Sequence, residues 1–241
     1  MTVLALLVDT TLQGVSLALT ALGDPKAKDA GILWRGAHLE NAGSVLTISD
    51  LLERGLAALG AEPHDLAAIG VANGPGSFTG IKVGLAFVHG LRLAFAEPPP
   101  VLALSSLEEA ALTLARQRAT AHLGLLLPAT RTHGYFAAVA DGVIRPARLV
   151  AFEGPTGADL GLPVDAPLCV FSDWPAAAAF CPNPLEKLAP SSVCGAAIYG
   201  MSVRSQALWP HGFVTAAPDP RYLRLSTAEE KLASSQKGHT P

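Results

Sequence analysis

Residues that mark several common protein classes are scarce in this chain of 241 residues. Its three cysteines, Cys169, Cys181 and Cys194, are odd in number and form no C-x-x-C pair, which argues against a disulfide framework and a zinc ribbon and favours buried free thiols. No apolar stretch approaches the roughly 18 to 20 residues that cross a bilayer. The opening apolar run is too short for a secretory signal and has no basic flank. We therefore expect a cytoplasmic protein without a membrane segment.

Charge is also scarce, since charged residues make up 15% of the chain and the formal net charge is −3. The basic residues occur as scattered pairs without a sustained patch, so we expect the chain alone to bind nucleic acid poorly. The seven histidines never stand four residues apart, the spacing with which one helix presents two ligands to a metal. We predict no metal site and no cofactor. The hydrophobic content of 50% suffices for a sizeable core in one domain or two small lobes.

Hydrophobic periodicity predicts strands followed by helices, and this order occurs twice. The expected strands are 3–8, 15–22, 31–37, 66–72, a short one that begins at residue 101, 123–127, 135–140 and 143–150, with a hairpin turn at Asp141-Gly142. The expected helices are 45–59, 79–94, one that opens with a capping box at Ser105 or Ser106, each of which has a glutamate three residues on, and 196–208. We assign 1–104 to a first lobe, 105–225 to a second lobe and 226–241 to a disordered tail. The order favours a duplicated ribonuclease-H-like α/β fold over a doubly wound sheet, whose first unit would be β-α-β.

The segment ANGPGSFTGIKVG, residues 72–84, follows a predicted strand and opens a predicted helix, as a phosphate-binding loop does. It does not match a Walker loop, because Ile81 intervenes before Lys82. It does not match the G-x-G-x-x-G fingerprint either, because Thr79 occupies the place of the third glycine. The residues alone favour a tight strand-to-helix turn, with Ser77 or Thr79 as the helix N-cap, over a phosphate site.

A second candidate phosphate loop lies at the tip of the first predicted hairpin, where the sequence reads Asp9-Thr10-Thr11. It resembles the first phosphate loop of the actin, sugar kinase and Hsp70 superfamily, in which an Asp orders a magnesium-bound water. Asp and Thr are also common turn residues, so the motif is weak by itself. A vestigial nucleotide site would comprise Asp9, Thr10, Thr11, Gly74, Gly76 and Ser77.

Four segments in collinear order resemble the TsaB (YeaZ) family: ALLVDTT, GVANGPGSFTGIKVG, VLALSSLEE and PRYLR. The resemblance covers most of residues 3–224. It implies a duplicated actin-like fold and a catalytically silent partner of the transferase TsaD. With the ATPase TsaE, the pair would add the N6-threonylcarbamoyl group to adenosine 37 of tRNA, and tRNA would be reached only through the complex. The lack of an H-x-x-x-H motif, through which the paralogous transferase holds its metal, agrees with a silent role.

The same resemblance makes the helices at 43–60 and 79–94 the expected contact surface for TsaD, or for a second copy of the chain when TsaD is absent. The 79–94 helix is apolar on most of its circumference, as helices are that lie deeply buried or at an interface. Gly80 and Gly84 are expected to form a groove that another backbone can approach. The candidate interface residues are Val45, Ile48, Leu52, Gly80, Val83, Gly84, Phe87 and Leu91.

Two alternatives remain beside the partner subunit. A nucleotide-dependent enzyme of the actin-like superfamily would use Asp9 and the 74–80 loop. Peptidase activity has no support, because the sequence holds neither a nucleophile elbow nor a cluster of metal ligands. Arg221 and Arg224 of PRYLR are expected to be solvated, although they could touch a phosphate or a partner's carboxylate.

Overall fold

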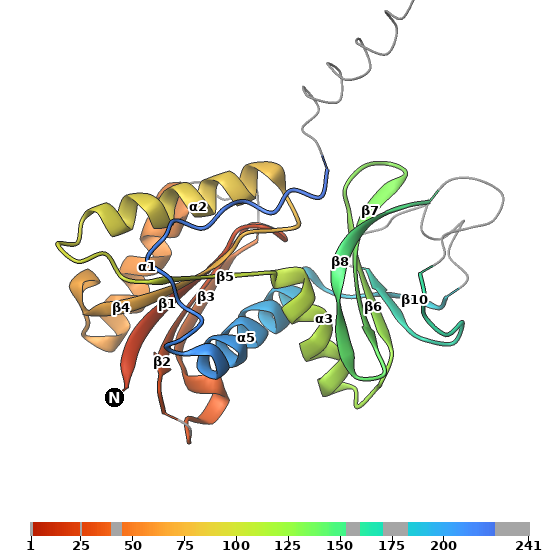
Figure 1. Cartoon of the computed structure of the whole chain (residues 1–241), viewed down its shortest axis with the longest axis horizontal. Coiled ribbons are helices and arrows are strands. Elements are labelled where there is room, and N and C mark those ends of the chain that lie inside the picture. Colours follow the sequence, from red (N-terminus) through yellow and green to blue (C-terminus); the bar gives the residue numbers. More distant parts are fainter. Residues whose placement is uncertain (1, 25, 40–44, 153–159, 171–182, 225–241) are drawn as a thin grey trace, which may run out of the picture.

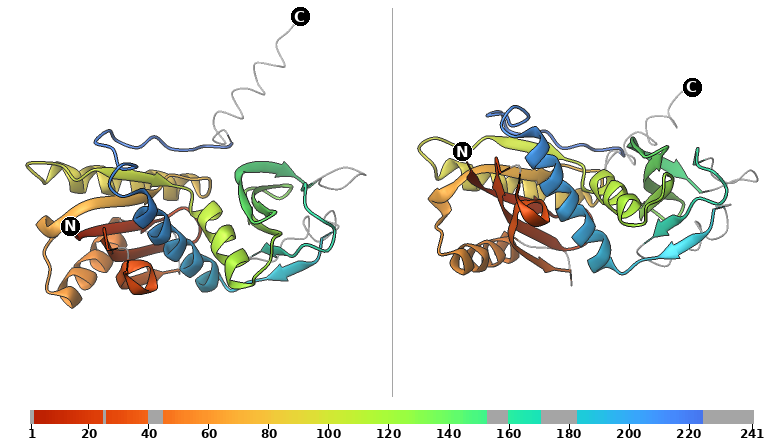
Figure 2. Two further views of the ribbon diagram at one scale, coloured as in Figure 1. Left: turned by 60° about the horizontal axis from the view of Figure 1, so that its bottom comes forward. Right: turned by 90° about the horizontal axis from the view of Figure 1, so that it is seen from below.

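The computed structural model describes residues 2–24, 26–39, 45–152, 160–170 and 183–224. The predicted tail at 226–241 and Cys181 lie outside these residues. Two sheets lie side by side, and helices lie on and between them (Figures 1 and 2). Among the described residues, no helix combines the length and the hydropathy that a membrane span requires.

The first sheet has five strands in the spatial order β3-β2-β1-β4-β5. Their bounds are β1 Val3–Asp9, β2 Val15–Leu22, β3 Ile32–His38, β4 Leu66–Ala72 and β5 Val101–Leu104. The first three strands form an antiparallel meander, whereas β4 joins β1 in parallel and β5 joins β4 in parallel. Parallel neighbours need a crossover. Helix α1 (Val45–Leu59) leads from β3 to β4, and helix α2 (Phe78–Leu93) leads from β4 to β5.

The second sheet repeats this arrangement, with the spatial order β8-β7-β6-β9-β10. Its strands are β6 Leu123–Pro128, β7 His133–Ala140, β8 Val143–Ala151, β9 Leu168–Val170 and β10 Leu185–Lys187. Again the first three strands in the chain are antiparallel neighbours, whereas β9 joins β6 in parallel and β10 joins β9 in parallel. The predicted duplicated ribonuclease-H-like fold is thereby confirmed. The predicted turn between β7 and β8 places Asp141 and Gly142 at φ values of 53° and 75°.

Helices cover both faces of the first sheet because its strands alternate apolar side chains between the faces. Leu17 and Leu19 pack in one core cluster with α1 and α2, whereas Ala5, Leu7 and Ala18 pack in another. The second cluster includes residues of α5 (Pro190–Leu208), which crosses this face of the sheet (Figure 2). Helix α3 (Ser106–Gln117) packs against α5 and the second sheet. Because α5 follows the second lobe in sequence but covers the first sheet, the division at residue 104 stays a prediction.

The structure differs from the predicted elements in a few places. Helix α5 begins at Pro190, not at residue 196, because proline suits the first position of a helix even where a proline-rich stretch predicts a loop. Strands β9 and β10 were missed, since three residues are too few to show a period. Two short 3₁₀ helices, η1 (Lys28–Gly31) and η2 (Pro63–Asp65), precede β3 and β4.

After α5 the chain returns across the first lobe as a segment without helix, which we call the C-terminal strap (213–224) (Figure 1). Val214 forms an antiparallel bridge with Val101 at the start of β5. Further along, the Arg221 backbone N–H donates to the Asn73 carbonyl oxygen at 2.7 Å. The Asn73 side chain returns a hydrogen bond to the Asp219 carbonyl oxygen at 2.9 Å. The strap is therefore held along the end of β4 as well as β5.

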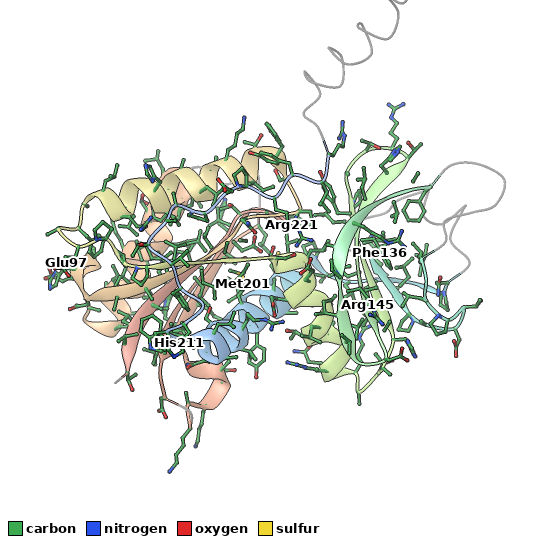
Figure 3. All side chains as sticks on the ribbon, viewed as in Figure 1. Glu97, Phe136, Arg145, Met201, His211 and Arg221 are labelled. Atoms are coloured by element: carbon green, nitrogen blue, oxygen red, sulfur yellow. The ribbon has the colours of Figure 1, made fainter. Side chains whose placement is uncertain are left out.

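Arg221 also joins the strap to the second half of the chain. Its Nη1 donates to Glu108 Oε1 of α3 at 2.6 Å, and Glu108 Oε1 accepts the Ala147 backbone N–H of β8 at 2.7 Å. Figure 3 shows Arg221 between the two sheets. The expectation of a solvated Arg221 was wrong, because the carboxylate that pairs with it belongs to the same chain. The predicted capping box is half formed: Ser105 Oγ accepts the Glu108 N–H at 3.3 Å, but the Glu108 carboxylate turns to Ala147 and Arg221.

Candidate functional site

The two candidate phosphate loops lie against each other in the structure. Strands β1 and β4 are parallel neighbours, so the turn after β1 and the glycine loop after β4 emerge at the same edge of the sheet. The Ser77 N–H donates to the Thr11 carbonyl oxygen at 2.8 Å. Thr10 Oγ1 donates to the Gly80 carbonyl oxygen at 2.7 Å. The Asp9–Thr11 turn thus occupies the space in front of the glycine loop.

Three glycines make this close approach possible. A Cβ atom at Gly76 would lie 2.1 Å from the Thr11 carbonyl oxygen, and one at Gly80 would lie 1.9 Å from the Thr10 carbonyl oxygen. A Cβ atom at Gly84 would lie 2.4 Å from Thr10 Oγ1. The groove that the sequence predicted for a partner's backbone at Gly80 and Gly84 is therefore filled by Thr10 of the same chain.

The N-terminus of α2 is closed by groups of the protein itself. Ser77, one of the two predicted candidates, is the N-cap, and its Oγ accepts the Gly80 N–H at 3.1 Å. The N–H of Ser77 itself points at Thr11. A phosphate site needs N–H groups that converge on open space in front of a helix. Here two of the N–H groups at this end of the helix are already engaged, which favours a structural turn.

Asp9 is buried at 2% exposure and holds the turn after β1 together. Its Oδ1 accepts the Thr11 N–H and the Thr11 Oγ1–H, both at 2.8 Å. Thr11 Oγ1 also lies 2.6 Å from Ser106 Oγ at the start of α3. The second carboxyl oxygen of Asp9 is buried and has no hydrogen-bond partner among the described residues. Burial raises the pKa of the Asp9 carboxyl, against a smaller lowering by the hydrogen bonds from Thr11.

The predicted interface residues lie at different depths. Ile48 and Leu52 of α1 are buried against the first sheet, at 0% and 6% exposure. Val83, Phe87 and Leu91 of α2 are half-buried and pack on the same core. For Val45, the structure describes the backbone as helical but not the side chain. The structure contains no partner chain, so the interface itself stays a prediction.

The residues of α2 that face away from the core form another stripe. We define it as the outer stripe of α2, which comprises Lys82, Ala86, His89 and Leu93. All four side chains are exposed, and Leu93 is 72% exposed. The spacing of four, three and four residues puts them on one face. Sequence periodicity did not select this stripe, because a helix that is apolar on several sides does not reveal which side faces the sheet.

The described residues contain no group of three or more His, Cys, Asp or Glu side chains that could hold a metal. Cys169 and Cys194 are buried free thiols, as predicted. Burial, assisted by the nearby Asp9, raises the pKa of the Cys194 thiol to about 12. Cys194 is therefore a neutral thiol at physiological pH.

Comparison with known proteins finds similarity to one protein family and to solved structures. A family profile described as TsaD, tRNA N6-adenosine threonylcarbamoyltransferase, matches residues 41–159. A structure of an uncharacterized protein from Pseudomonas aeruginosa with similarity to peptidase YeaZ superposes with a TM-score of 0.68 at 21% identity, covering 92% of this chain and 100% of that one. YeaZ from Pseudomonas aeruginosa superposes with a TM-score of 0.62 at 19% identity over the same shares. No curated protein sequence matches the chain.

The glycine contacts lead to a first prediction. Gly80→Ala should lower the free energy of unfolding by about 1 to 3 kcal/mol, because the methyl group would overlap the Thr10 carbonyl oxygen. Gly90→Ala is the matched control in the same helix, since nothing lies within 4 Å of its added Cβ. That variant should be about 0.5 to 1 kcal/mol more stable than the wild type. Urea unfolding measures both, and equal effects at the two positions would contradict the packing described here.

Asp9 leads to a second prediction, which concerns pH. Its folded pKa lies above the ordinary value of 3.8, so the folded state holds the proton more tightly than the unfolded state. This contribution to stability is complete below the unfolded pKa and is lost as the pH rises through the folded pKa. Asp9→Asn cannot titrate and should gain stability relative to the wild type as the pH rises from about 4 to 8.

Urea unfolding across that pH range, with the two proteins measured side by side, tests the Asp9 prediction. Asp50→Asn, at an exposed position of α1, is the matched control and should follow the wild type at every pH. A stability difference between Asp9→Asn and the wild type that does not change with pH would show that the buried carboxyl does not titrate as described.

Proposed function

We propose that the chain is a member of the family of TsaD and YeaZ proteins, to which it is similar, and that it is a cytoplasmic, non-catalytic partner subunit of a TsaD-type transferase. In this role it would form a heterodimer that makes N6-threonylcarbamoyladenosine at position 37 of tRNA and that recruits a TsaE-type ATPase. Contact with tRNA would come through the complex, in keeping with the net charge of −3. Without its partner the chain would pair with a second copy through the same surface.

The observation that carries the non-catalytic role is the hydrogen bond from Ser77 N–H to the Thr11 carbonyl oxygen, at 2.8 Å. It closes the loop that an actin-like enzyme would present to a phosphate. The hydrogen bond from Thr10 Oγ1 to the Gly80 carbonyl oxygen is a second contact between the Asp9–Thr11 turn and the glycine loop. Opening the site would break both bonds, and a typical intramolecular hydrogen bond contributes about 0.5 to 1.5 kcal/mol to stability.

The surface that supports a partner role consists of α1 and the outer stripe of α2. Leu46 of α1 and Leu93 of α2 are the two most exposed leucines of the described residues, at 75% and 72%. They belong to the two helices on the same face of the first sheet. Exposed apolar side chains on neighbouring helices are typical of a protein contact surface. Ala86, near the middle of the outer stripe, is small enough to let a partner helix approach closely.

This surface gives a third prediction. Ala86→Glu and Leu93→Glu should each weaken binding to a TsaD-type partner by about tenfold or more, because a carboxylate would lose its water at the contact. Both positions are exposed, so the fold should be unaffected. Phe87 is less suitable because it packs on the core. Titration calorimetry with the purified transferase measures the affinity, and thermal unfolding checks the fold.

Val164→Glu is the matched control for the contact surface. Val164 is 69% exposed and lies in the second half of the chain, away from α1 and α2. It should bind the transferase as the wild type does. If both stripe variants also bind with wild-type affinity, the partner surface lies elsewhere and the proposed role of α2 is wrong.

The alternative function is a nucleotide-dependent enzyme that uses Asp9 and the 74–80 loop. Because the two loops are bonded to each other, we predict that the isolated chain shows no saturable ATP binding at about 1 mM nucleotide with magnesium. Calorimetry on the wild type and on Asp9→Ala measures this directly. Saturable binding in the wild type that is lost in Asp9→Ala would favour the alternative over the partner role.

A further inference from the structure

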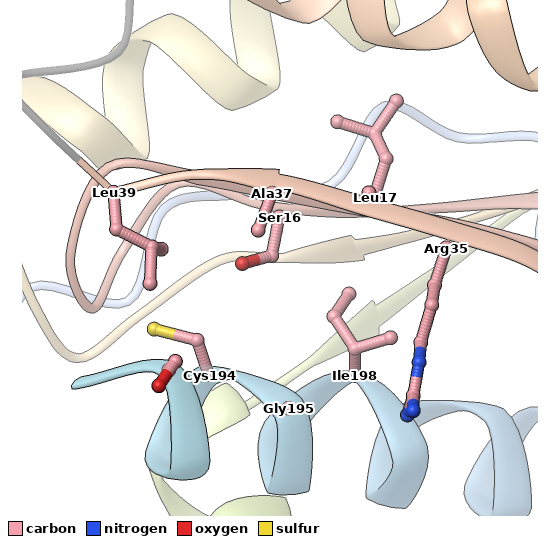
Figure 4. A pocket seen from close by; sticks show the side chains of 10 residues that line it. Ser16, Leu17, Arg35, Ala37, Leu39, Cys194, Gly195 and Ile198 are labelled. Atoms are coloured by element: carbon pink, nitrogen blue, oxygen red, sulfur yellow. The ribbon is translucent and has the colours of Figure 1, made fainter. Parts of the chain in front are cut away.

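A cavity of about 340 Å³ lies between the first sheet and α5, on the opposite face of the sheet from α2. Its walls come from β2, from β3 and the residue after it, and from the first turns of α5 (Figure 4). Sites for small molecules in proteins occupy about 300 to 1,000 Å³. The cavity has room for roughly ten water molecules.

The cavity has an apolar body and a polar rim. Leu39 and Ile198 project into it from opposite sides, and Ala37 adds to the apolar wall (Figure 4). Cys194 contributes a neutral thiol, because burial raises its pKa to about 12. The polar side chains of the lining are the hydroxyl groups of Ser16 and Ser191 together with the guanidinium of Arg35. None of the described residues that line the cavity is an Asp or a Glu.

Among the described residues of the lining, Arg35 is the one that carries a charge. It reaches from β3 toward α5 across the space (Figure 4). It is exposed and makes no hydrogen bond or ion pair with any residue that the structure describes. The first turn of α5 adds a weaker positive field at the same cavity, since it has no acidic residue and no side-chain cap. A negatively charged group of a ligand would therefore be attracted to Arg35 and to the first turn of α5, and its apolar part would lie beside the apolar walls.

We propose that this cavity binds a small organic anion, whose carboxylate pairs with Arg35 and whose short apolar body lies between Leu39 and Ile198. A guanidinium offers a two-pronged donor that matches a carboxylate. The Ser16 and Ser191 hydroxyl groups can complete the hydrogen bonds of the carboxylate. The ligand would bridge β3 and α5, and so would stabilise the packing of α5 on the first sheet.

A second hollow beside α5 provides an internal contrast. It has a volume of about 530 Å³ and is lined by Asp24, Tyr199 and Gln206 among others, with no Arg or Lys among the described residues of its lining. Its size alone would admit the same ligand. The charge of Asp24 would repel a carboxylate, so an anion should bind in the cavity beside Arg35 in preference to this hollow.

Hexanoate is the probe, titrated into the full-length chain and followed by two-dimensional amide NMR. A ligand of this size should bind with a Kd of about 1 mM. The shift changes should centre on residues 16–17, 35–37 and 194–198. Neutral hexanamide should bind about tenfold more weakly, because it lacks the charge that meets Arg35.

Variants locate the carboxylate. Arg35→Gln should weaken hexanoate binding about tenfold, and Arg35→Lys should retain most of it, since it keeps the charge. Arg54→Gln removes the same charge from an exposed position on α1, on the other face of the sheet, and should bind as the wild type does. Arg35 is exposed on an edge strand, so its variants should fold, which the NMR spectra themselves verify.

Four outcomes would overturn the proposal. One is a lack of saturation at about 20 mM hexanoate, well above the expected Kd. Another is a set of shift changes centred on Tyr199 and Gln206. The third is equal affinity for hexanoate and hexanamide, and the fourth is equal weakening by Arg35→Gln and Arg54→Gln. None of these measurements involves the transferase or a nucleotide, so the result does not depend on the proposed partner role.

Discussion

The packing of the glycine loop on the Asp9–Thr11 turn is the constraint on which the rest of the structure depends. Parallel pairing of β1 with β4 brings the two turns to one edge of the sheet, and the absence of side chains at Gly76 and Gly80 lets them touch. This contact fixes where α2 starts and hence which of its faces is turned outward. It also buries Asp9, whose partner Thr11 reaches Ser106 at the start of α3. One contact therefore orients the helical surface of the first lobe and links it to the second.

The C-terminal strap completes that link from the other side. Gly74, the first glycine of the loop, lies so close to the strap that a Cβ atom there would stand 2.5 Å from the Arg221 carbonyl oxygen. The Arg221 side chain then reaches Glu108. The GPGSFTG motif resembles a phosphate loop because both need backbone without side chains at a close approach. In this protein the group that approaches the loop is another segment of the same chain, at Gly74, Gly76 and Gly80.

The two faces of the first sheet carry two separate candidate binding sites. On one face, α1 and α2 present the proposed contact surface for a transferase. On the other face, α5 and β3 enclose the cavity with Arg35. Because the sheet lies between them, a protein partner and a small anion would not compete for the same residues. A ligand that tightens α5 against the sheet would also tighten α3, since these two helices pack together. The cavity is thus connected to the junction of the two lobes.

The sequence by itself determined most elements and the duplicated fold, since hydrophobic period and the chemistry of turns act over a few residues. Asp141-Gly142 and the Ser77 cap are local features of this kind. Only the tertiary structure decided what fills the space beside Gly80, because Thr10 lies 70 residues away in sequence and arrives there through strand order. The same holds for Glu108, whose local capping role is overridden by Arg221 at a separation of 113 residues. The outer stripe of α2 and the lining of the Arg35 cavity were likewise set by how distant segments pack, which no short-range pattern in the sequence records.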